Sequence, residues 1–319
     1  MTASGAFEPT LSPRRVTRAE RIAEDIHLFE LRDPAGGDLP EFTAGSHVTL
    51  RVPSGLLRKY SLCNDPAERD RHVIAVKREA SGRGGSESLI RDAQVGSEVM
   101  VSAPVNNFAL AKAVGGHLFV AGGIGISPIM AMIRQLAAAG GRFQLYYCTR
   151  SPAATAFRDA LGAFGRQVVI HHDGGDLACA LDLWPVLEKP QARQLYCCGP
   201  RGLMQAVRDM TGHWSPSAVH FESFTDAAPR PDDKPFTVRL ARSGDTVAVP
   251  AGMTILAALR AHGLDVPSSC ESGTCGTCRT RLISGEADHR DLVLADDERA
   301  SNIMLCVSRA HSDKLVIDR

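Results

Sequence analysis

The chain has 319 residues, of which 44% are hydrophobic, and its 36 lysines and arginines balance 36 aspartates and glutamates. At roughly 150 residues per domain, this length predicts about two domains of an ordinary globular protein. The formal net charge of zero argues against a general nucleic-acid binder, which would carry a marked excess of basic residues.

No targeting or membrane segment is expected. Residues 1–15 lack the apolar run of about 7 to 15 residues that a secretory signal requires. The longest uncharged apolar run, residues 118–133, is shorter than the roughly 20 residues that span a bilayer, and glycines interrupt it. We therefore expect a cytoplasmic protein with no membrane partner. Its nine cysteines then indicate metal ligation, catalysis or burial rather than disulfides.

The first third of the chain has a β pattern. Between residues 14 and 110, short runs of β-forming residues are separated by turns, at 26–33, 46–53, 59–64, 72–79 and 97–104. This spacing is typical of an antiparallel barrel or sandwich.

The pattern changes after Gly115 and Gly116. Apolar strands then alternate with helical stretches, with strands at 117–123, 143–150, 167–173 and 194–200 and helices at 127–140, 155–165 and 201–213. Such alternation predicts βαβ units and a parallel sheet.

A linker and a third pattern follow. The stretch 225–235 is polar and rich in proline, so we expect an exposed linker and a domain boundary there. Residues 237–250 then contain two alternating runs that predict a β-hairpin. A short helix is expected at 254–263, with Thr254 as its N-cap and Gly263 as its C-cap.

The strongest chemical signal is a set of four cysteines with C-x4-C-x2-C…C spacing: Cys270, Cys275, Cys278 and Cys306. This is the spacing of plant-type [2Fe-2S] ferredoxins, in which four thiolates hold two irons. Gly273 and Gly276 allow the turns by which a compact loop directs N–H groups toward the cluster. The alternatives are a zinc site, whose paired C-x2-C spacing is absent here, and four structural cysteines.

Two glycine-rich loops are candidate binding sites. Gly122, Gly123 and Gly125 lie between a strand and a helix, where a phosphate or ring can approach the backbone. The loop is not a Rossmann fingerprint, because Pro128 replaces the third glycine and the acidic ribose ligand is absent. A tight packing turn is the alternative. Loop 81–86 suits a terminal phosphate, with a flexible hairpin loop as its alternative.

Five motifs occur in one order along the chain: residues 58–61, 83–86, 122–128 and 198–200, and the four cysteines. This order resembles the phthalate dioxygenase reductase family, within the ferredoxin reductase-like superfamily, over nearly the whole chain. The resemblance implies a multidomain fold: an antiparallel β-barrel flavin domain at 1–112 and an α/β parallel-sheet NAD-binding domain at 113–225. After a linker at 226–234, it implies an α+β, β-grasp ferredoxin domain with a plant-type [2Fe-2S] cluster at 235–319.

The resemblance also implies a flavin site, which we expect to hold FMN rather than FAD because loop 81–86 is short. Ser61 is expected near the reactive N5 atom, and Ser61 and Lys77 are expected to tune the flavin. The implied FMN-binding residues are Arg58, Lys59, Tyr60, Ser61, Ala75, Val76, Lys77, Arg83, Gly84, Gly85 and Ser86, the last four for the phosphate.

For the nucleotide, the resemblance implies Gly122, Gly123, Gly125, Ser127, Thr149, Arg150, Cys198, Gly199 and Pro200. Cys198 is expected beside the nicotinamide C4 and Ser127 between nicotinamide and flavin, while Cys197 is expected to pack inward. Phe224 matches an aromatic residue that covers the flavin, or else it is a core phenylalanine. Arg150 suits the 2′-phosphate of NADPH, yet the family generally uses NADH with Thr-Arg here, so NADH is expected.

Cofactor chemistry then orders the electron path. NADH gives two electrons together and a [2Fe-2S] cluster accepts them singly, so FMN belongs between the two. The resemblance implies the reductase component of a Rieske-type aromatic-ring oxygenase or demethylase, with Ser61, Cys198 and Phe224 at the reacting groups. The alternatives are a reductase for a haem or di-iron monooxygenase, and an iron–sulfur redox sensor.

An acidic stretch lies between the third and fourth cysteines. It contains six carboxylates, with Arg290 as the only arginine or lysine among them: Glu286, Asp288, Asp291, Asp296, Asp297 and Glu298. The stretch forms either an acidic docking rim for a basic oxygenase surface or a solvated charged face.

Overall fold

The structure is a computed structural model that describes residues 9–80, 82–224, 230 and 232–319. The described residues form two compact units, one within Gly5–His220 and the other within Phe221–Arg319. The signal-peptide prediction for residues 1–8 and most of the linker prediction lie outside the described residues. Within the described part, no helix combines the length and the apolar character needed to cross a membrane.

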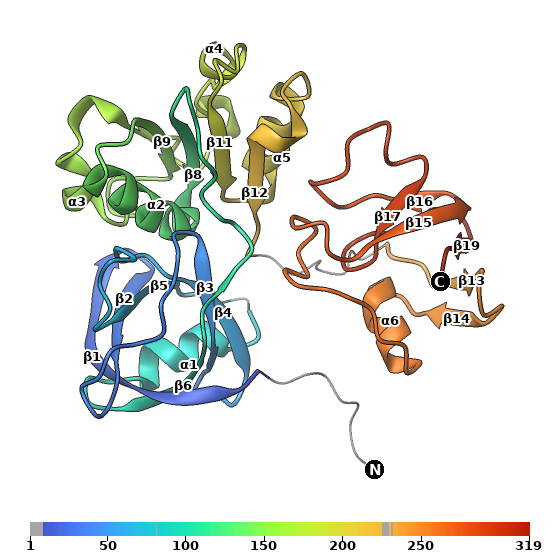
Figure 1. Ribbon diagram of the computed structural model, residues 1–319, viewed down its shortest axis with the longest axis horizontal. Helices are drawn as coiled ribbons and strands as arrows, with labels where there is room; N and C mark the ends of the chain where they lie inside the picture. Colours follow the sequence, from blue (N-terminus) through green and yellow to red (C-terminus); the bar gives the residue numbers. More distant parts are fainter. Residues whose placement is uncertain (1–8, 81, 225–229, 231) are drawn as a thin grey trace. The chain divides into compact units, whose positions relative to one another are not determined.

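The first sheet of the larger unit is antiparallel and has the order β4-β3-β6-β1-β2-β5, with β7 paired to β3 (Figure 1). Its two outer strands meet through an antiparallel bridge between Leu62 and Ile74, and this bridge curls the sheet toward a barrel. Helix α1, Gly85–Asp92, lies between β5 and β6 in the chain. The strands are β1 Leu11–Ala23, β2 Ile26–Arg32, β3 Ser46–Arg51, β4 Leu57–Ser61, β5 His72–Lys77, β6 Glu98–Ser102 and β7 Val105–Asn106.

The five expected β runs correspond to β2 to β6, whereas the longest strand, β1, was not among them. Charged residues interrupt the hydrophobic alternation in its sequence, LSPRRVTRAERIA. Pairing with β2 and β6 nevertheless buries Val16 and Arg14. Cross-strand partners far along the chain, rather than local hydrophobic pattern, therefore decide this strand.

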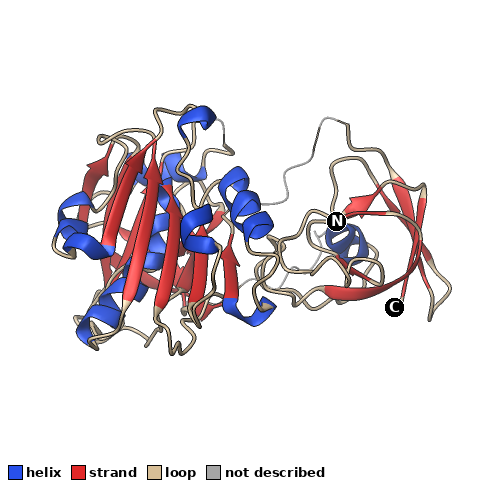
Figure 2. Ribbon diagram, turned by 90° about the horizontal axis from the view of Figure 1, so that it is seen from above, coloured by secondary structure: helices blue, strands red, loops and turns tan. Residues whose placement is uncertain are grey.

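The second sheet confirms the predicted βαβ alternation. Its order is β10-β9-β8-β11-β12, and the pairs β10–β9, β9–β8 and β8–β11 are parallel. Helices flank the strands of this unit (Figure 2). The strands are β8 His117–Gly122, β9 Phe143–Thr149, β10 Val168–His172, β11 Gln194–Cys198 and β12 Val219–Glu222. The helices are α2 Ile126–Ala138, α3 Arg158–Gly162, α4 Trp184–Leu187 and α5 Arg201–Met210, with short 3-10 turns η1 Gly123–Gly125, η2 Gly165–Gln167, η3 Leu177–Cys179 and η4 Pro216–Ala218.

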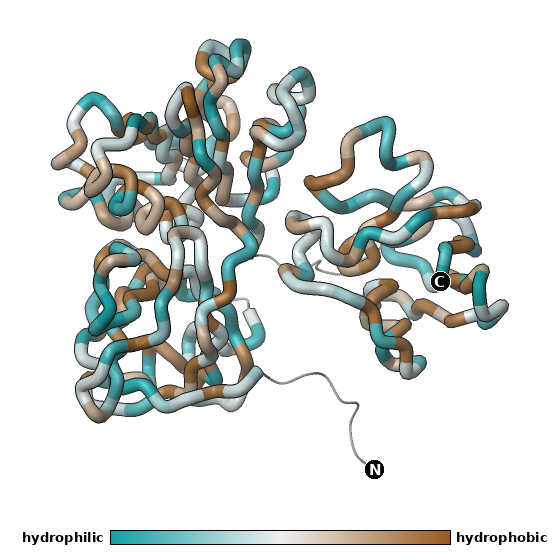
Figure 3. The backbone as a smooth tube through the Cα atoms, in the orientation of Figure 1, coloured by the Kyte–Doolittle hydropathy of each residue, from teal (hydrophilic) through white to brown (hydrophobic). Residues whose placement is uncertain are grey.

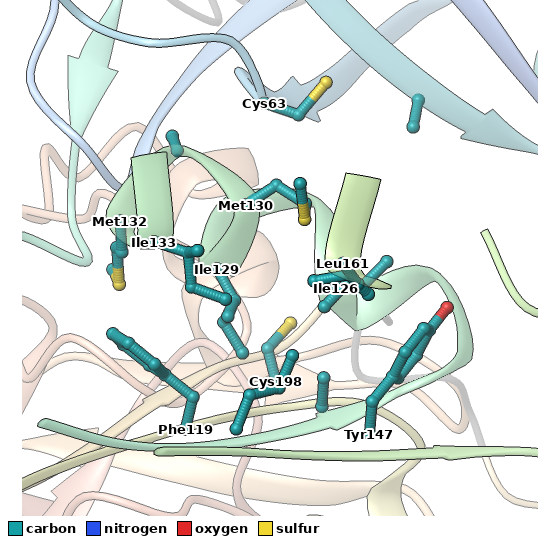
Figure 4. Packing of buried hydrophobic residues seen from close by; sticks show 14 of the residues in the cluster. Cys63, Phe119, Ile126, Ile129, Met130, Met132, Ile133, Tyr147, Leu161 and Cys198 are labelled. Carbon is teal, nitrogen blue, oxygen red and sulfur yellow. The ribbon is translucent and has the colours of Figure 1, made fainter. Parts of the chain in front are cut away.

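One hydrophobic core joins the two sheets of the larger unit. Ala75 of the first sheet and Cys63, in the loop after β4, share a cluster of buried side chains with Phe119, Met130 and Tyr147. Figure 4 shows Cys63 on one side of α2, and Phe119 and Tyr147 on the other. Figure 3 shows that hydrophobic and hydrophilic segments alternate along the backbone. Helix α2 is therefore buried from both sides, with residues 126–133 fully enclosed.

The smaller unit is a mixed sheet with one helix, which confirms the α+β expectation. The order is β14-β13-β19-β15-β17, in which β13–β19 is parallel and the other pairs are antiparallel. A separate antiparallel pair, β16–β18, lies outside it. The strands are β13 Phe236–Leu240, β14 Thr246–Val249, β15 Arg279–Ser284, β16 Ala287–Asp288, β17 Asn302–Met304, β18 Arg309–Ala310 and β19 Lys314–Ile317.

Helix α6, Ile255–Ala261, has the predicted N-cap, whereas its C-cap is His262 and the predicted C-cap, Gly263, is the next residue. Thr254 Oγ1 accepts a hydrogen bond from the Ala257 amide at 3.1 Å, and Gly263 follows the helix with φ +86°. Leu256 and Leu259 on its inner face are buried in the core of the unit. The helix thus begins and ends at signals that were readable in the sequence.

The expectation of an exposed linker is wrong at Asp233. Its side chain is only 3% exposed and forms ion pairs with Arg290 at 2.5 Å and Arg309 at 3.5 Å. Two buried guanidinium groups need a nearby negative charge, and Asp233 supplies it. The end of the linker is therefore part of the smaller unit.

Candidate flavin, nucleotide and cluster sites

The structure brings the predicted flavin residues of three elements together. Strand β5 lies against β4, α1 and η1, so residues 58–61, 75–77, 84–86 and 123–125 occupy one region of the larger unit. This proximity follows from the Leu62–Ile74 bridge, which joins the two ends of the first sheet.

Strand β4 provides a buried polar group that suits a bound cofactor. The Tyr60 hydroxyl is buried and has no hydrogen-bond partner among the described residues. Burial raises the pKa of Tyr60 to about 12, so the hydroxyl keeps its proton at neutral pH. Ser61, the next residue, is 3% exposed, whereas Lys59 is exposed. A buried donor without a partner is costly, and a flavin oxygen or phosphate beside Tyr60 would remove that cost.

The start of α1 has the geometry of a phosphate site. Gly84 adopts φ +78°, and among the described residues no side chain caps the first turn of the helix. A Cβ on Gly85 would lie 2.6 Å from Arg58 Nε, so the guanidinium rests against the first turn. The amide of Glu79 donates to Ser86 Oγ at 3.0 Å and holds the loop. Amide groups and a guanidinium together attract an anion.

The Arg58 side chain thus lies against the start of α1, and its role in flavin binding stays a prediction. Of the β5 residues, Ala75 and Val76 are buried at 3% and 0%, and Lys77 is exposed. Ala75 packs in the core shared with α2, which brings the flavin strand next to the nucleotide domain.

Three glycines let two backbone loops approach closely. A Cβ on Gly125 would lie 2.1 Å from the Cys198 carbonyl oxygen, and one on Gly122 would lie 2.5 Å from Pro200 Cδ. A Cβ on Gly199 would lie 2.9 Å from Gly122 Cα. Gly122 and Gly125 therefore form a tight packing turn, which was the alternative interpretation of this loop. Their role in nucleotide binding stays a prediction. Gly123 differs, since a Cβ there would meet nothing within 4 Å.

The residues expected near the nicotinamide are mostly buried. Ser127 is 2% exposed and its hydroxyl donates to the Ile124 carbonyl at 2.8 Å. Cys197 is 0% exposed, as predicted, and burial raises its pKa. Cys198 is also 0% exposed and lies in the core with Ile126, as Figure 4 shows. Its place beside a nicotinamide stays a prediction.

At the carboxyl end of β9, Thr149 and Arg150 differ in accessibility. Thr149 is 5% exposed, and its hydroxyl lies 2.8 Å from Thr155 Oγ1 and 2.9 Å from His172 Nδ1. Arg150 is exposed, so it is the side chain of this pair that a nucleotide can reach. Phe224 is 44% exposed, so the core-phenylalanine alternative is wrong, and covering the flavin stays its predicted role.

The four cysteines of the smaller unit form one cluster of thiols. Cys270 contacts Cys275 and Cys306, and Cys306 contacts Cys278. The contact with Cys275 lowers the pKa of Cys270, while contact with Cys270 raises the pKa of both Cys275 and Cys306. Four thiolates this close repel one another, so two iron cations suit the set.

The surroundings of the thiols fit a binuclear cluster. Gly273 and Gly276 adopt φ of +76° and +81°, as the loop prediction requires. The Ser272 amide donates to Cys270 Sγ at 3.4 Å, and Thr277 Oγ1 lies 3.2 Å from Cys275 Sγ. No three metal-binding side chains in the described residues surround a single ion site. A two-iron cluster does not require three ligands around one ion, because each iron binds only two of the four cysteines.

Neither interpretation of the acidic stretch holds for all of it. Asp291 is 3% exposed, and the Asp288 side chain is 12% exposed and bonded to Arg290. Glu298 pairs with Arg279 at 2.7 Å. The interpretation as a docking rim is therefore wrong for Asp288 and Asp291, because their charges face the interior. The exposed carboxylates of the stretch are Glu286, Asp296 and Asp297.

Comparison with known proteins gives two matching domain families. Residues 13–110 match the oxidoreductase FAD-binding domain, and residues 238–311 match the 2Fe-2S iron-sulfur cluster binding domain. The first match covers the antiparallel sheet and α1, and the second covers the four-thiol cluster.

Relatives match over the whole length. The chain is 52% identical to the phthalate 4,5-dioxygenase oxygenase reductase subunit of Pseudomonas putida, covering 100% of each chain. It is 55% identical to the phthalate dioxygenase reductase of Burkholderia cepacia, covering 95% of this chain and 96% of the relative. A solved structure of a phthalate dioxygenase reductase, described as modular for electron transfer from pyridine nucleotides to [2Fe-2S], matches with a TM-score of 0.71. That match has 53% identity and covers 97% of this chain and 98% of the other.

Proposed function

Because the chain belongs to the phthalate dioxygenase reductase family, we propose that it is the NADH-dependent reductase component of a Rieske-type oxygenase or demethylase. It is an electron-transfer oxidoreductase that uses a flavin and a [2Fe-2S] cluster. The observation that carries the proposal is that the cluster of four cysteine thiols and a flavin site occur in the same chain. When bound, a flavin accepts a hydride and releases electrons singly, which suits a one-electron cluster.

The residues of this chain bind and orient the cofactors. The first turn of α1 and the Arg58 guanidinium hold the flavin phosphate, and the Tyr60 hydroxyl donates to a flavin oxygen or phosphate. The buried helix α2 keeps the nucleotide side of the unit against the flavin strands. The cluster thiols hold iron, with Cys278 and Cys306 enclosed in the core.

The finer assignments are part of the same proposal. FMN is favoured over FAD by the short loop at residues 81–86, and NADH over NADPH because the family generally uses NADH with Thr-Arg at positions 149 and 150. The partner is a terminal oxygenase that receives single electrons from the cluster, and the protein works in the cytoplasm without nucleic-acid or membrane partners.

The cofactor content tests this assignment. Acid treatment of the purified protein should release FMN, and iron and sulfide analysis should give about two of each per chain. FAD in the acid extract would overturn the FMN assignment, and a chain without iron would overturn the proposed function.

The electron order is tested with Cys275→Ser, and Cys179→Ser, at an exposed cysteine of the larger unit, is the matched control. Cys275→Ser should abolish NADH-dependent reduction of cytochrome c, because one cluster ligand is lost. Reduction of ferricyanide should persist, since the flavin site lies in the other unit. The control should retain both activities, and equal loss of both in Cys275→Ser would contradict the order.

A further inference from the structure

Asp291 is a buried carboxylate that the proposed function does not use. Its side chain is 0% exposed, and no arginine in the described part of the chain pairs with its carboxylate, whereas Asp233 and Glu298 of the same unit are both paired with arginines. Burial of a charge is costly unless the protein compensates it, so a fully enclosed aspartate indicates a specific role. Its position in the loop between β16 and β17 suggests what that role is.

The groups that face Asp291 keep it ionised. His289 Nδ1 lies 3.7 Å from Asp291 Oδ1, and Arg299 Nη2 donates to the Asp291 carbonyl at 3.4 Å. Burial raises the pKa of Asp291, but the His289 side chain, the Leu294 amide and the Arg299 charge together lower it below its ordinary value. Oδ2 accepts a hydrogen bond from the Leu294 amide at 2.8 Å, and Oδ1 accepts none among the described residues. The negative charge of Asp291 is therefore only partly compensated by its hydrogen bonds and by the neighbouring side chains.

The same residue lies against the cysteine loop. The Leu292 amide donates to the Gly273 carbonyl at 3.0 Å. A Cβ on Gly273 would lie 3.1 Å from Asp291 Cα and 2.7 Å from Val307 Cγ2. Gly273 stands between Cys270 and Cys275, and Val307 follows Cys306. The loop that carries the first cysteines is thus enclosed between Asp291 and the segment that carries the last one.

We propose that Asp291 is a positioning residue of the cluster site, which braces the cysteine loop and lowers the midpoint potential of the cluster through its buried negative charge. The physical reason is that reduction adds an electron to an already anionic group, and a fixed negative charge behind its loop opposes this addition. The inference rests on the proposed function, because it requires iron at the four cysteines.

The test compares Asp291→Asn with Asp297→Asn in the full-length protein with its cofactors. Asparagine keeps an oxygen for the Leu294 amide and removes the charge, and Asp297 is an exposed control on the same loop. The midpoint potential of the cluster is measured by spectroelectrochemical titration, with iron content and the electron paramagnetic resonance spectrum of the reduced cluster as checks of its integrity.

Asp291→Asn should make reduction of the cluster about tenfold more favourable, which for a one-electron couple is a rise of about 59 mV. Asp297→Asn should change the equilibrium of cluster reduction less than about twofold, because solvent screens an exposed charge. An Asp291→Asn protein with full iron and an unchanged potential would overturn the inference and leave the proposed function intact. Wild-type protein without iron would instead contradict the proposed function.

A second variant decides the matter if Asp291→Asn loses its cluster. Arg299→Gln removes the positive charge that faces Asp291 and leaves the aspartate in place. The potential should then move in the opposite direction and fall. An unchanged or raised potential in Arg299→Gln would overturn the inference.

Discussion

Tyr60 is the single residue whose state in the folded chain points most directly to a ligand. Its ring is held on β4, yet its hydroxyl is buried without a hydrogen-bond partner among the described residues. Such a group lowers the free energy of unfolding of the cofactor-free protein by about 1 to 3 kcal/mol. The RKYS motif indicated a flavin residue here, but only the folded strand shows that the hydroxyl is enclosed.

Tyr60→Phe should act in opposite directions on stability and on flavin binding. Without flavin, the free energy of unfolding should rise by about 1 kcal/mol, because the unpaired hydroxyl is gone. The dissociation constant of FMN should increase about 5- to 30-fold, corresponding to one lost hydrogen bond. Urea denaturation and fluorescence titration measure the two quantities. Tyr146→Phe, at a half-buried tyrosine of β9, is the control and should leave flavin affinity unchanged.

At the scale of elements, the end of the linker and strand β18 are held together by charge. Asp233 pairs with Arg290 and Arg309, and Arg309 also donates to the Lys234 carbonyl at 2.8 Å. The Arg309 guanidinium lies 5.1 Å from the centre of the Phe236 ring, at the start of β13. Three segments distant in the sequence therefore meet at one buried ion cluster.

Asp233→Asn should destabilise the smaller unit by about 3 kcal/mol, because both guanidinium groups lose a buried counter-charge. Hydrogen bonding from Arg290 lowers the pKa of Asp233. A lowered folded-state pKa contributes stability that is complete above the ordinary pKa of 3.8 and is lost as pH falls through the lower folded value. Thermal loss of the cluster absorbance, followed at neutral and acidic pH, measures both effects.

The control for this variant is Asp232→Asn, at an exposed neighbour in the same segment. It should leave the thermal transition within about 0.5 kcal/mol of wild type, as surface substitutions usually do. Equal effects of the two substitutions would show that the ion cluster adds no stability.

At the scale of the whole molecule, the flavin and nucleotide parts behave as one body. Residues of the first sheet, such as Ala75, share their core with α2 and the second sheet. The length of the chain predicted about two domains and the resemblance implied three modules. The structure has two compact units because the antiparallel sheet and the α/β part bury apolar surface against each other.

Calorimetry should therefore show two unfolding transitions, one for each unit. Met130→Ala, at a side chain 1% exposed in the shared core, should lower the stability of the whole larger unit by about 2 to 5 kcal/mol. Val114→Ala, at a valine 89% exposed in the same unit, should have little effect. A third transition that is insensitive to Met130→Ala would contradict the shared core.

Local signals explain which parts of the fold the sequence predicts. Helix α6 was predicted because Thr254 and Gly263 mark its ends, and the cysteine loop because its spacing is specific. Strand β1 and the burial of Asp233 were missed, since each depends on distant partners; Arg290 is 57 residues from Asp233. The same reason applies to the acidic stretch, where Asp288 and Asp291 count as surface charges until their partners are known.

The sequence by itself determined the chemistry: four cysteines at ligand spacing, a phosphate loop, and flavin and nucleotide motifs in one order. These motifs can be recognised in the sequence because a bound ligand requires particular residue types at short spacing. Only the tertiary structure decided which groups are enclosed: the Tyr60 hydroxyl, the Asp233 ion cluster and Asp291 behind the cysteine loop. Burial is a property of contacts between distant segments, and it converts ordinary polar residues into ones with large energetic effects.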